Sequence, residues 1–397
     1  MKYLVLFLIA LAGCGECWAG LRVALLTLDP GRDIYELEGH SELRFVDPDR
    51  DLDMSVSWGV FDFDSPGFVY RFVKGDTDYI AASRPYRDFL AINGYYGRRV
   101  TCQWLDLDSI EAEKMLAMAE RNLLPENRVY RYNYVKDNCA TRPLALIGQG
   151  VGEDLVHQRR DSLAGTTWRG EMARYHAGYP WYQFGIDLAL GSGIDKPLTV
   201  LEQCYAPVFM SRYLQEATRA DGRPIVSGEP VTVLEGTPEG RPEEATPWYL
   251  TPMAAACLLL LLTCMVAYRD VRRRRRPSKW LYTTLYGLGT VAGAVLTFLI
   301  FVSTHEATSP NWLYLWLNPL CLAGVVGVWL KKYNRAVYFY QIVNFVALIS
   351  LVAIGLAGIQ HLNSADYPLV MCFMITAGEY IYLYRCHKKS TSLSRAV

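Results

Sequence analysis

The chain has 397 residues, enough for two domains, and its formal net charge is zero. That zero hides two halves of opposite charge: residues 20–251 hold 25 Lys and Arg against 35 Asp and Glu, whereas residues 252–397 hold 14 against 4. The balance is −10 in the first half and +10 in the second, largely apolar half. The acidic first half excludes a surface for nucleic-acid phosphates, and the contrast predicts an aqueous domain followed by a membrane domain.

The first 19 residues have the pattern of an export signal. Lys2 supplies the positive start, an apolar run follows from Tyr3 to Ala12, and Cys17-Trp18-Ala19 has the form of a cleavage site. The run is too short to span a bilayer. A second interpretation stays open, because Leu11-Ala12-Gly13-Cys14 resembles a lipobox that would lipidate Cys14. We favour cleavage near Ala19, because the folded domain begins at Leu21 and a lipidated Cys14 would have only a short linker before it.

Short strands are predicted along the next hundred residues, because runs of β-branched and aromatic residues alternate with turn signals such as Asp29-Pro30-Gly31. We expect strands at Leu21–Leu28, Leu43–Val46, Met54–Phe61, Phe68–Val73, Phe89–Ile92 and Val100–Leu105.

Two helices are predicted in the same half. Apolar residues recur at helical spacing over 109–123, and Asp108 with Glu111 has the pattern of a capping box. A shorter helix is expected from Cys139 to Ile147, ended by nearby glycines. The stretch 176–206 is predicted to be irregular, and residues 219–247 to form a hairpin and a juxtamembrane linker.

Five apolar runs in the second half are each close to the length that crosses a hydrocarbon core of about 30 Å. They cover 248–268, 280–302, 312–330, 336–359 and 367–384. The basic residues fall in the first loop, the third loop and the tail, and the two loops between these, 303–311 and 360–366, have no Lys or Arg. The positive-inside rule therefore predicts a cytoplasmic C-terminus in the inner membrane and an exported first domain.

The exported half keeps an odd number of cysteines, Cys102, Cys139 and Cys204. In an oxidising compartment an odd cysteine indicates a free thiol, and whether Cys102 pairs with Cys204 stays open. The spacing lacks a CxxC pair, so we expect no metal site and no cofactor.

His40 and Cys139 are the residues of this half that best fit catalysis. Cys139 lies at a predicted helix start, where the helix dipole lowers a thiol pKa, and an imidazole can take the proton. Free backbone N–H groups at the same helix end can stabilise an oxyanion. Asn138 fits two roles, an oxyanion donor or a helix cap.

The amino-acid sequences of several motifs resemble those of the Lnb N-terminal periplasmic domain. This domain is named after lacto-N-biosidase-associated proteins and is classed as a domain of unknown function. The resemblance covers roughly residues 21–215, and the following spans resemble the five-helix domain that accompanies it. The motifs include Leu25-Leu26-Thr27, Gly39-His40-Ser41-Glu42-Leu43-Arg44, Trp58-Gly59-Val60-Phe61-Asp62-Phe63, Tyr70–Gly75, Pro125–Arg128, Tyr132-Asn133-Tyr134, Asp137–Arg142 and Trp181–Gly191.

That resemblance implies a fold class: an α+β papain-like domain of the circularly permuted NlpC type, followed by an all-α bundle of five transmembrane helices. It also implies Cys139 as nucleophile and His40 as base. Ser57 is our candidate for the group that orients His40, with Asp53 as the alternative, although the family more often has Asn on this strand. The expected division is 1–19 signal peptide, 20–218 periplasmic domain, 219–247 linker, 248–386 transmembrane domain and 387–397 cytoplasmic tail.

Further polar and aromatic residues are candidates for binding, each weighed against an ordinary structural role. Candidates for substrate contact are Trp58, Arg71, Arg142, Trp181 and Asp187. Polar residues near the exported ends of the spans are expensive to bury in lipid, so they are candidates for a second polar pocket: His305, Asn311, Asn318 and His361.

The sequence therefore predicts a membrane-anchored thiol hydrolase or acyltransferase of the cell envelope. Its expected partners are the lipid bilayer and a lipid-linked or peptide substrate, with no nucleic acid and the oligomeric state left open. The alternative is a non-catalytic assembly or binding module on the same anchor. A transporter with a sensing domain is disfavoured, since the spans lack paired broken helices in two matching halves.

Overall fold

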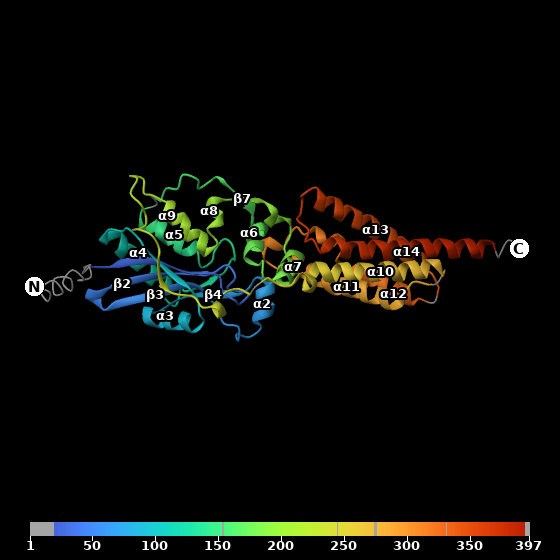
Figure 1. Cartoon of the computed structure of the whole chain (residues 1–397), viewed down its shortest axis with the longest axis horizontal. Helices are drawn as coiled ribbons and strands as arrows, with labels where there is room; N and C mark the ends of the chain where they lie inside the picture. Colours follow the sequence, from blue (N-terminus) through green and yellow to red (C-terminus); the bar gives the residue numbers. More distant parts are fainter. Residues whose placement is uncertain (1–19, 153–154, 244, 274–275, 331, 394–397) are drawn as a thin grey trace, which may run out of the picture. The chain divides into compact units, whose positions relative to one another are not determined.

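The computed structural model describes residues 20–152, 155–243, 245–273, 276–330 and 332–393, so the predicted signal peptide and the lipobox at Cys14 lie outside the described residues. The chain forms two compact units that interleave in sequence (Figure 1). The first unit holds the described residues up to Phe61, then Asp78–Ser162 and Thr199–Arg241. The second holds Asp62–Thr77, Leu163–Leu198 and the rest of the chain from Pro242.

A seven-stranded sheet with the order β6-β4-β3-β2-β1-β5-β9 forms the centre of the first unit, and each neighbouring pair is antiparallel. The strands are β1 (Arg22–Leu28), β2 (His40–Asp47), β3 (Leu52–Val60), β4 (Asp78–Pro85), β5 (Val100–Trp104), β6 (Val129–Arg131) and β9 (Val231–Leu234). Two further strands, β7 (Leu163–Thr167) and β8 (Pro197–Thr199), form a separate pair. The predicted α+β class of this half is confirmed.

Successive residues of each strand point to opposite faces of the sheet, and helices pack against these faces. On one face Ala24, Leu26 and Leu28 of β1 pack with Tyr86 and Phe89 of α3. The helices of this unit are α3 (Tyr86–Tyr95), α4 (Ser109–Leu123), α5 (Thr141–Gly150), α8 (Val200–Gln203) and α9 (Pro207–Glu216). The predicted capping box of α4 is present, since Asp108 and Glu111 each accept a backbone N–H of the other.

Three local predictions were wrong. The run Phe68–Val73 belongs to a helix, α2 (Phe68–Lys74), and Phe89–Ile92 lies inside α3. Both runs contain β-favouring side chains, but that propensity is weak and tertiary contacts decide the conformation. The stretch 176–206 is more ordered than expected, with α7 (Pro180–Ala189), a 3-10 turn η2 (Ser192–Asp195), β8 and α8.

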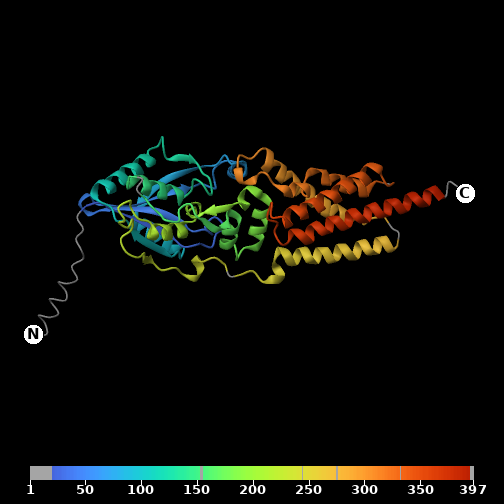
Figure 2. The ribbon, with the colours of Figure 1, turned by 90° about the horizontal axis from the view of Figure 1, so that it is seen from above.

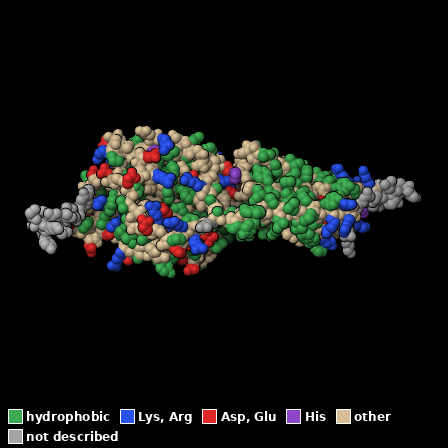
Figure 3. Space-filling view, in the orientation of Figure 1, with side chains coloured by type: hydrophobic (Ala, Val, Ile, Leu, Met, Phe, Trp, Pro, Cys, Tyr) green, Lys and Arg blue, Asp and Glu red, His purple; other side chains and the backbone are tan. Residues whose placement is uncertain are grey.

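Long helices make up most of the second unit and run side by side in both ribbon views (Figures 1 and 2). They are α10 (Pro252–Arg272), α11 (Lys279–Phe301), α12 (Leu322–Trp329), α13 (Arg335–Leu356) and α14 (Asp366–Leu393). Four segments of the described chain are long and apolar enough to cross a membrane: 252–272, 279–301, 312–329 and 335–356. On the face drawn in Figure 3, hydrophobic side chains cover these helices, and Lys and Arg gather at the end near the C-terminus.

The third span is not the continuous helix that we predicted over 312–330. Two 3-10 turns, η6 (Trp312–Leu315) and η7 (Pro319–Cys321), precede α12. Asn318 is the N-cap of η7 and links it to η6: its side chain accepts from Leu320 N–H at 3.1 Å and donates to the Tyr314 carbonyl at 2.9 Å. A Cβ at Gly293 of α11 would collide with the Asn318 backbone, so the break packs directly on α11.

Segments from the exported half of the sequence also belong to the second unit. They are α2, α6 (Trp168–Tyr175), α7 and η2. The same unit includes two short turns from later in the chain, η4 (Trp248–Leu250) and η5 (Glu306–Thr308). Leu188 and Ala189 of α7 pack against the apolar core of the long helices. The unit that contains the membrane spans therefore includes structure contributed by residues before the first span.

Candidate functional site

The imidazole of His40 lies beside the hydroxyl of Ser57 on neighbouring strands. Glu42 of β2 pairs with Ser57 of β3, and strand alternation puts the His40 side chain on the same face as both. His40 Nε2 is 2.8 Å from Ser57 Oγ and 3.8 Å from a Glu42 carboxylate oxygen. Arg84 of β4 completes the group, 3.5 Å from Glu42. Asp53, the alternative partner for His40, instead forms a two-bond ion pair with Arg44, both bonds at 2.8 Å.

The His40 ring is neutral at physiological pH. Burial, followed by the positive charges of Arg98 and Arg84, lowers the pKa of His40 to about 3. A neutral imidazole has one nitrogen able to accept a proton, and a pKa this far below neutral makes the ring a weaker base than an ordinary histidine.

Cys139 lies just before α5 and contacts the ends of β2 and β3. Ser41, the residue after His40, donates from Oγ to the Cys139 carbonyl at 2.5 Å. The backbone N–H groups of Ser41 and of Cys139 itself both hydrogen-bond the thiol. On β3, a Cβ at Gly59 would lie 3.8 Å from the Cβ of Cys139. Gly59 has φ +95°, a conformation that disfavours other residues, and it lets the two elements approach.

The thiol of Cys139 is buried, with 8% of the residue exposed, and it is free. We expected the helix start to lower its pKa. Burial instead raises the pKa of Cys139 to about 12, because the loss of solvation outweighs the two backbone N–H groups, and Glu38 and Glu42 add to the increase. The thiol is therefore protonated at rest. Cys102 and Cys204 are also buried and free, so the structure has no disulfide between them.

Asn138 organises the turn in front of α5. Its Oδ1 accepts the N–H groups of Ala140 and Thr141, each at 2.9 Å, and its Nδ2 donates to the carbonyls of Tyr134 at 2.8 Å and Tyr205 at 2.9 Å. These are the contacts of a helix cap, the second of the two predicted roles. Both amide hydrogens are taken by carbonyl groups, so Asn138 has no donor left for an oxyanion in this structure.

Two candidates for substrate contact, Trp58 and Arg142, line one cavity of about 450 Å³ beside α4 and α5. The indole of Trp58 donates to Asn122 at 3.2 Å. The Arg142 guanidinium pairs with Asp137 at 2.5 and 2.8 Å and lies 3.4 Å from the ring centre of Tyr130. Trp58 precedes Gly59, and Asp137 and Arg142 flank Cys139 in sequence, so this cavity adjoins the residues around the thiol.

The other three candidates for substrate contact belong to the second unit, each in a contact of its own. Arg71 donates to Ser65 at 2.7 Å, and the Trp181 indole donates to the Leu250 carbonyl at 2.7 Å. Asp187 is buried and accepts from Arg169 at 3.0 Å, and also from Gln183 and Asn363, both at 2.8 Å.

The four polar residues near the exported ends of the spans are spread over separate contacts rather than brought into one pocket. His305 Nε2 lies 2.7 Å from the Phe72 carbonyl. Asn311 donates to the Leu188 carbonyl at 2.9 Å and accepts from Gln360 at 3.0 Å. Asn318 caps η7, and the backbone N–H of His361 donates to Asp195 at 3.1 Å.

Sequence reasoning missed three residues of these networks. Glu42 is two residues after His40, so strand periodicity alone places it on the same face. Gly59 follows Trp58 at the end of a predicted strand, where glycine indicates a bulge or a close approach. Arg169 is buried and pairs with both Asp187 at 3.0 Å and Asp195 at 2.6 Å, and nothing in its local sequence signals that role.

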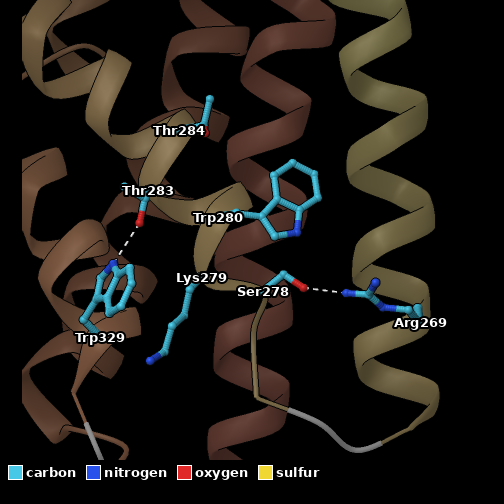
Figure 4. Close-up of a pocket in the computed structure, with 7 residues that line it drawn as sticks. All are labelled: Arg269, Ser278, Lys279, Trp280, Thr283, Thr284 and Trp329. Atoms are coloured by element: carbon cyan, nitrogen blue, oxygen red, sulfur yellow. Dashed lines mark hydrogen bonds between the residues drawn. The ribbon is translucent and has the colours of Figure 1, made fainter.

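A larger cavity, of about 580 Å³, opens at the other end of the membrane helices (Figure 4). It is lined by Arg269, Ser278, Lys279, Trp280, Thr283, Thr284 and Trp329. The Trp329 indole donates to Thr283 at 2.9 Å, and Arg269 donates to Ser278 at 2.6 Å. Within the described ranges, no group of three or more His, Cys, Asp or Glu side chains is placed to hold a metal ion.

Comparison with known families gives two matches, one in each half. The Lnb N-terminal periplasmic domain matches residues 19–169, and the Lnb transmembrane domain matches residues 243–389. No curated protein and no solved structure shows significant similarity to the chain. The two matches lie in the order expected from the motifs and together cover about three quarters of the residues. The chain is a membrane protein of the Lnb family, with an N-terminal periplasmic domain and a C-terminal transmembrane domain.

Proposed function

We propose that the protein is a thiol hydrolase or acyltransferase that acts beside the membrane on a peptide, amide or lipid ester. Cys139 is the nucleophile, His40 is the base, and Ser57 orients the imidazole. One observation supports this proposal: consecutive residues of β2 contact the partner of the imidazole and the backbone of Cys139. His40 holds the ring against Ser57, and Ser41 supplies both the N–H that bonds the thiol and the hydroxyl that bonds the Cys139 carbonyl.

The chemistry starts from a neutral pair. The Cys139 thiol gives its proton to His40 as the sulfur attacks the substrate carbonyl carbon, and an imidazolium and a tetrahedral oxyanion form together. The backbone N–H of Cys139, which bonds the thiol at rest, would bond the oxyanion instead once the carbon–sulfur bond has formed. The leaving group takes the proton from His40, and a thioester remains on Cys139. Water or a second acceptor then releases the acyl group, with His40 again as the base.

The same proposal includes the finer architecture. His40 precedes Cys139 in the chain, as in permuted papain-like folds, and a sheet strand and a helix start carry the two residues. We also propose α14 as a fifth span of the inner membrane. At about 1.5 Å per residue its 28 residues are about 42 Å long, and Lys388 and Lys389 near its end favour the cytoplasm.

A second candidate function is a non-catalytic assembly or binding module. The burial of the Cys139 thiol and its raised pKa favour it, since resting thiolates are the reactive form of cysteine.

Acylation of the full chain separates the two functions. The protein in detergent is incubated with p-nitrophenyl butyrate, quenched in acid, and digested for mass spectrometry. We expect a butyryl group on the peptide with Cys139, absent in Cys139→Ser and reduced at least 100-fold in His40→Ala, the usual contribution of a general base. Cys102→Ser is the matched control, because Cys102 is also buried and free, and it should leave the adduct unchanged.

Two results would favour the binding module instead. One is the absence of any adduct in a preparation that melts cooperatively. The other is an equal rate of acylation in His40→Ala, which would show a thiol that needs no base.

A further inference from the structure

The short helix α2 exposes an apolar surface that a soluble domain would be expected to bury. Val69 is 73% exposed and Tyr70 is 59% exposed, and Phe63 and Phe72 are exposed beside them. Phe63, Phe68 and Phe72 form a row of ring contacts along this surface, with centroids 5.0 and 6.0 Å apart. A contiguous apolar patch of this kind marks a protein or membrane contact.

The C-terminal end of α2 is bound to the chain that follows membrane helix α11. The carbonyl of Phe72 accepts from His305, at 2.7 Å, the carbonyl of Val73 accepts from the Ser303 hydroxyl at 2.8 Å, and the carbonyl of Lys74 accepts from the Thr304 N–H at 2.8 Å. The last carbonyls of a helix lack partners within it, so the bonds to Val73 and Lys74 satisfy such groups, whereas the Phe72 carbonyl also accepts the Gly75 N–H at 3.0 Å.

Gly75 makes this attachment possible. It ends α2 with φ +83°, and a Cβ at this position would collide with the Thr304 hydroxyl. The attachment therefore depends on one glycine, which both turns the chain and leaves space for the loop after α11.

A ring contact also places α2 at the level of the last turn of α11. Tyr70 packs on Phe298, one turn before the end of α11, with ring centres 5.9 Å apart. Because α10 begins directly after the periplasmic half of the chain and α11 returns, the end of α11 is on the periplasmic side. Just before α10, η4 exposes Trp248 at 79%, with Tyr249 and Leu250 also exposed, and Trp181 of α7 bonds the Leu250 carbonyl.

We propose that α2 and Phe63, together with Trp181 and Trp248–Leu250, form an interfacial anchor seated in the periplasmic leaflet of the bilayer. The occupant is the boundary between phospholipid headgroups and acyl chains, because the anchor is bonded to the ends of helices that cross that leaflet. Tyr and Trp favour this boundary, and apolar helix faces with flanking basic residues, here Arg71 and Lys74, lie along it. A segment between the two catalytic-sheet strands β3 and β4 is thereby a membrane-contacting element.

Site-specific photocrosslinking tests the anchor in the full chain. Benzoylphenylalanine is placed at Val69 or, as the matched control, at Ile110 of α4, an aliphatic residue that is 79% exposed on the first unit. Each protein is reconstituted in vesicles of phosphatidylethanolamine and phosphatidylglycerol at 3:1, irradiated, and analysed by mass spectrometry. We expect phospholipid adducts at position 69 at least tenfold above those at position 110.

Equal lipid yields at the two positions would overturn the proposal, and so would adducts at position 69 that are chiefly to another protein chain. A second comparison tests the attachment. Gly75→Ala should displace α2 and lower the lipid yield at position 69 severalfold, whereas Gly67→Ala, also at positive φ but with open space around it, should not. An unchanged yield in Gly75→Ala would show that the loop after α11 does not hold α2 at the membrane.

Discussion

The hydroxyl of Ser57 lies 2.8 Å from Nε2 of His40, across two neighbouring strands. This contact sets the ring orientation on the sheet; Ser57 and Glu42 are buried beneath the ring, which is itself partly exposed. The arrangement is a side chain oriented by a second side chain, and the residue after His40, Ser41, bonds the Cys139 carbonyl. The contributions of the His40 ring, the Ser57 hydroxyl and Gly59 can be measured separately, through acylation rates and thermal stability.

Ser57→Ala should slow acylation of Cys139 about fivefold, because a neutral hydrogen bond contributes roughly 1 kcal/mol. The measurement is the rate of butyryl adduct formation under saturating ester. Ser55→Ala is the control, since Ser55 is buried on the same strand face and contacts Glu42 rather than His40. If both variants lose the same rate, Ser57 acts only through the stability of the sheet.

Acid should destabilise the protein through His40. The unfolded chain binds a proton on this ring below about pH 6.5, and the folded chain does so only near pH 3, so folding free energy is lost as the pH falls between these values. Thermal midpoints at pH 7, 6, 5 and 4 should decline less steeply in His40→Gln. Some slope should remain, because burial also lowers the pKa of His157. A slope identical to that of the original chain would contradict a buried neutral ring.

Gly59→Ala should disrupt the site more than its size suggests. The position has φ +95°, and the added Cβ would lie 3.1 Å from the Tyr132 ring and 3.8 Å from the Cβ of Cys139. We expect a loss of at least tenfold in Cys139 acylation and a lower thermal midpoint. Gly67→Ala carries a similar backbone strain at φ +65° with no atom within 4 Å, so it isolates the steric contribution. Equal acylation rates in both variants would refute close packing of β3 against the thiol.

Arg169→Met should destabilise the second unit by about 3–5 kcal/mol, because it leaves the carboxylates of Asp187 and Asp195 buried without their shared cation. Thermal unfolding of the full chain in detergent measures this change. Arg174→Met is the control, since Arg174 is exposed on the same helix and its pairing with Glu171 is at 3.5 Å. A loss no larger than that of the control would mean that water reaches the two aspartates.

Local signals predicted the parts of the fold that depend on few distant contacts. The α4 capping box was confirmed because Asp108 and Glu111 are three residues apart, and apolar length alone located four of the five predicted membrane spans. The sequence did not predict α2 as a helix. Its Phe-Val-Tyr-Arg-Phe-Val run favours a strand, and the bonds that hold its end as a helix come from residues about 230 positions later.

In the candidate site, too, local signals predicted some features and distant contacts determined the rest. The motifs pointed to His40 and Cys139, and Ser57 was a candidate on the next strand. The contact between His40 and Ser57 depends on the register of β2 against β3, which the sequence did not predict. The raised pKa of Cys139 was not predictable from its helix start, because the burial that causes it comes from β2, β3 and the Tyr132 loop. Asn138 could be read as a donor or a cap, and only the positions of the Tyr134 and Tyr205 carbonyls decided between them.

The attachment of Phe72, Val73 and Lys74 to residues 303–305 has a practical consequence for anyone who wishes to study the water-exposed half in isolation. An ectodomain truncated before Pro252 would lose the donors that hold the end of α2, and Asp187 would lose Asn363. We therefore expect the truncated protein to aggregate and to be partly unfolded over residues 62–77 and 163–198. The autonomous folding unit does not end where the first span begins.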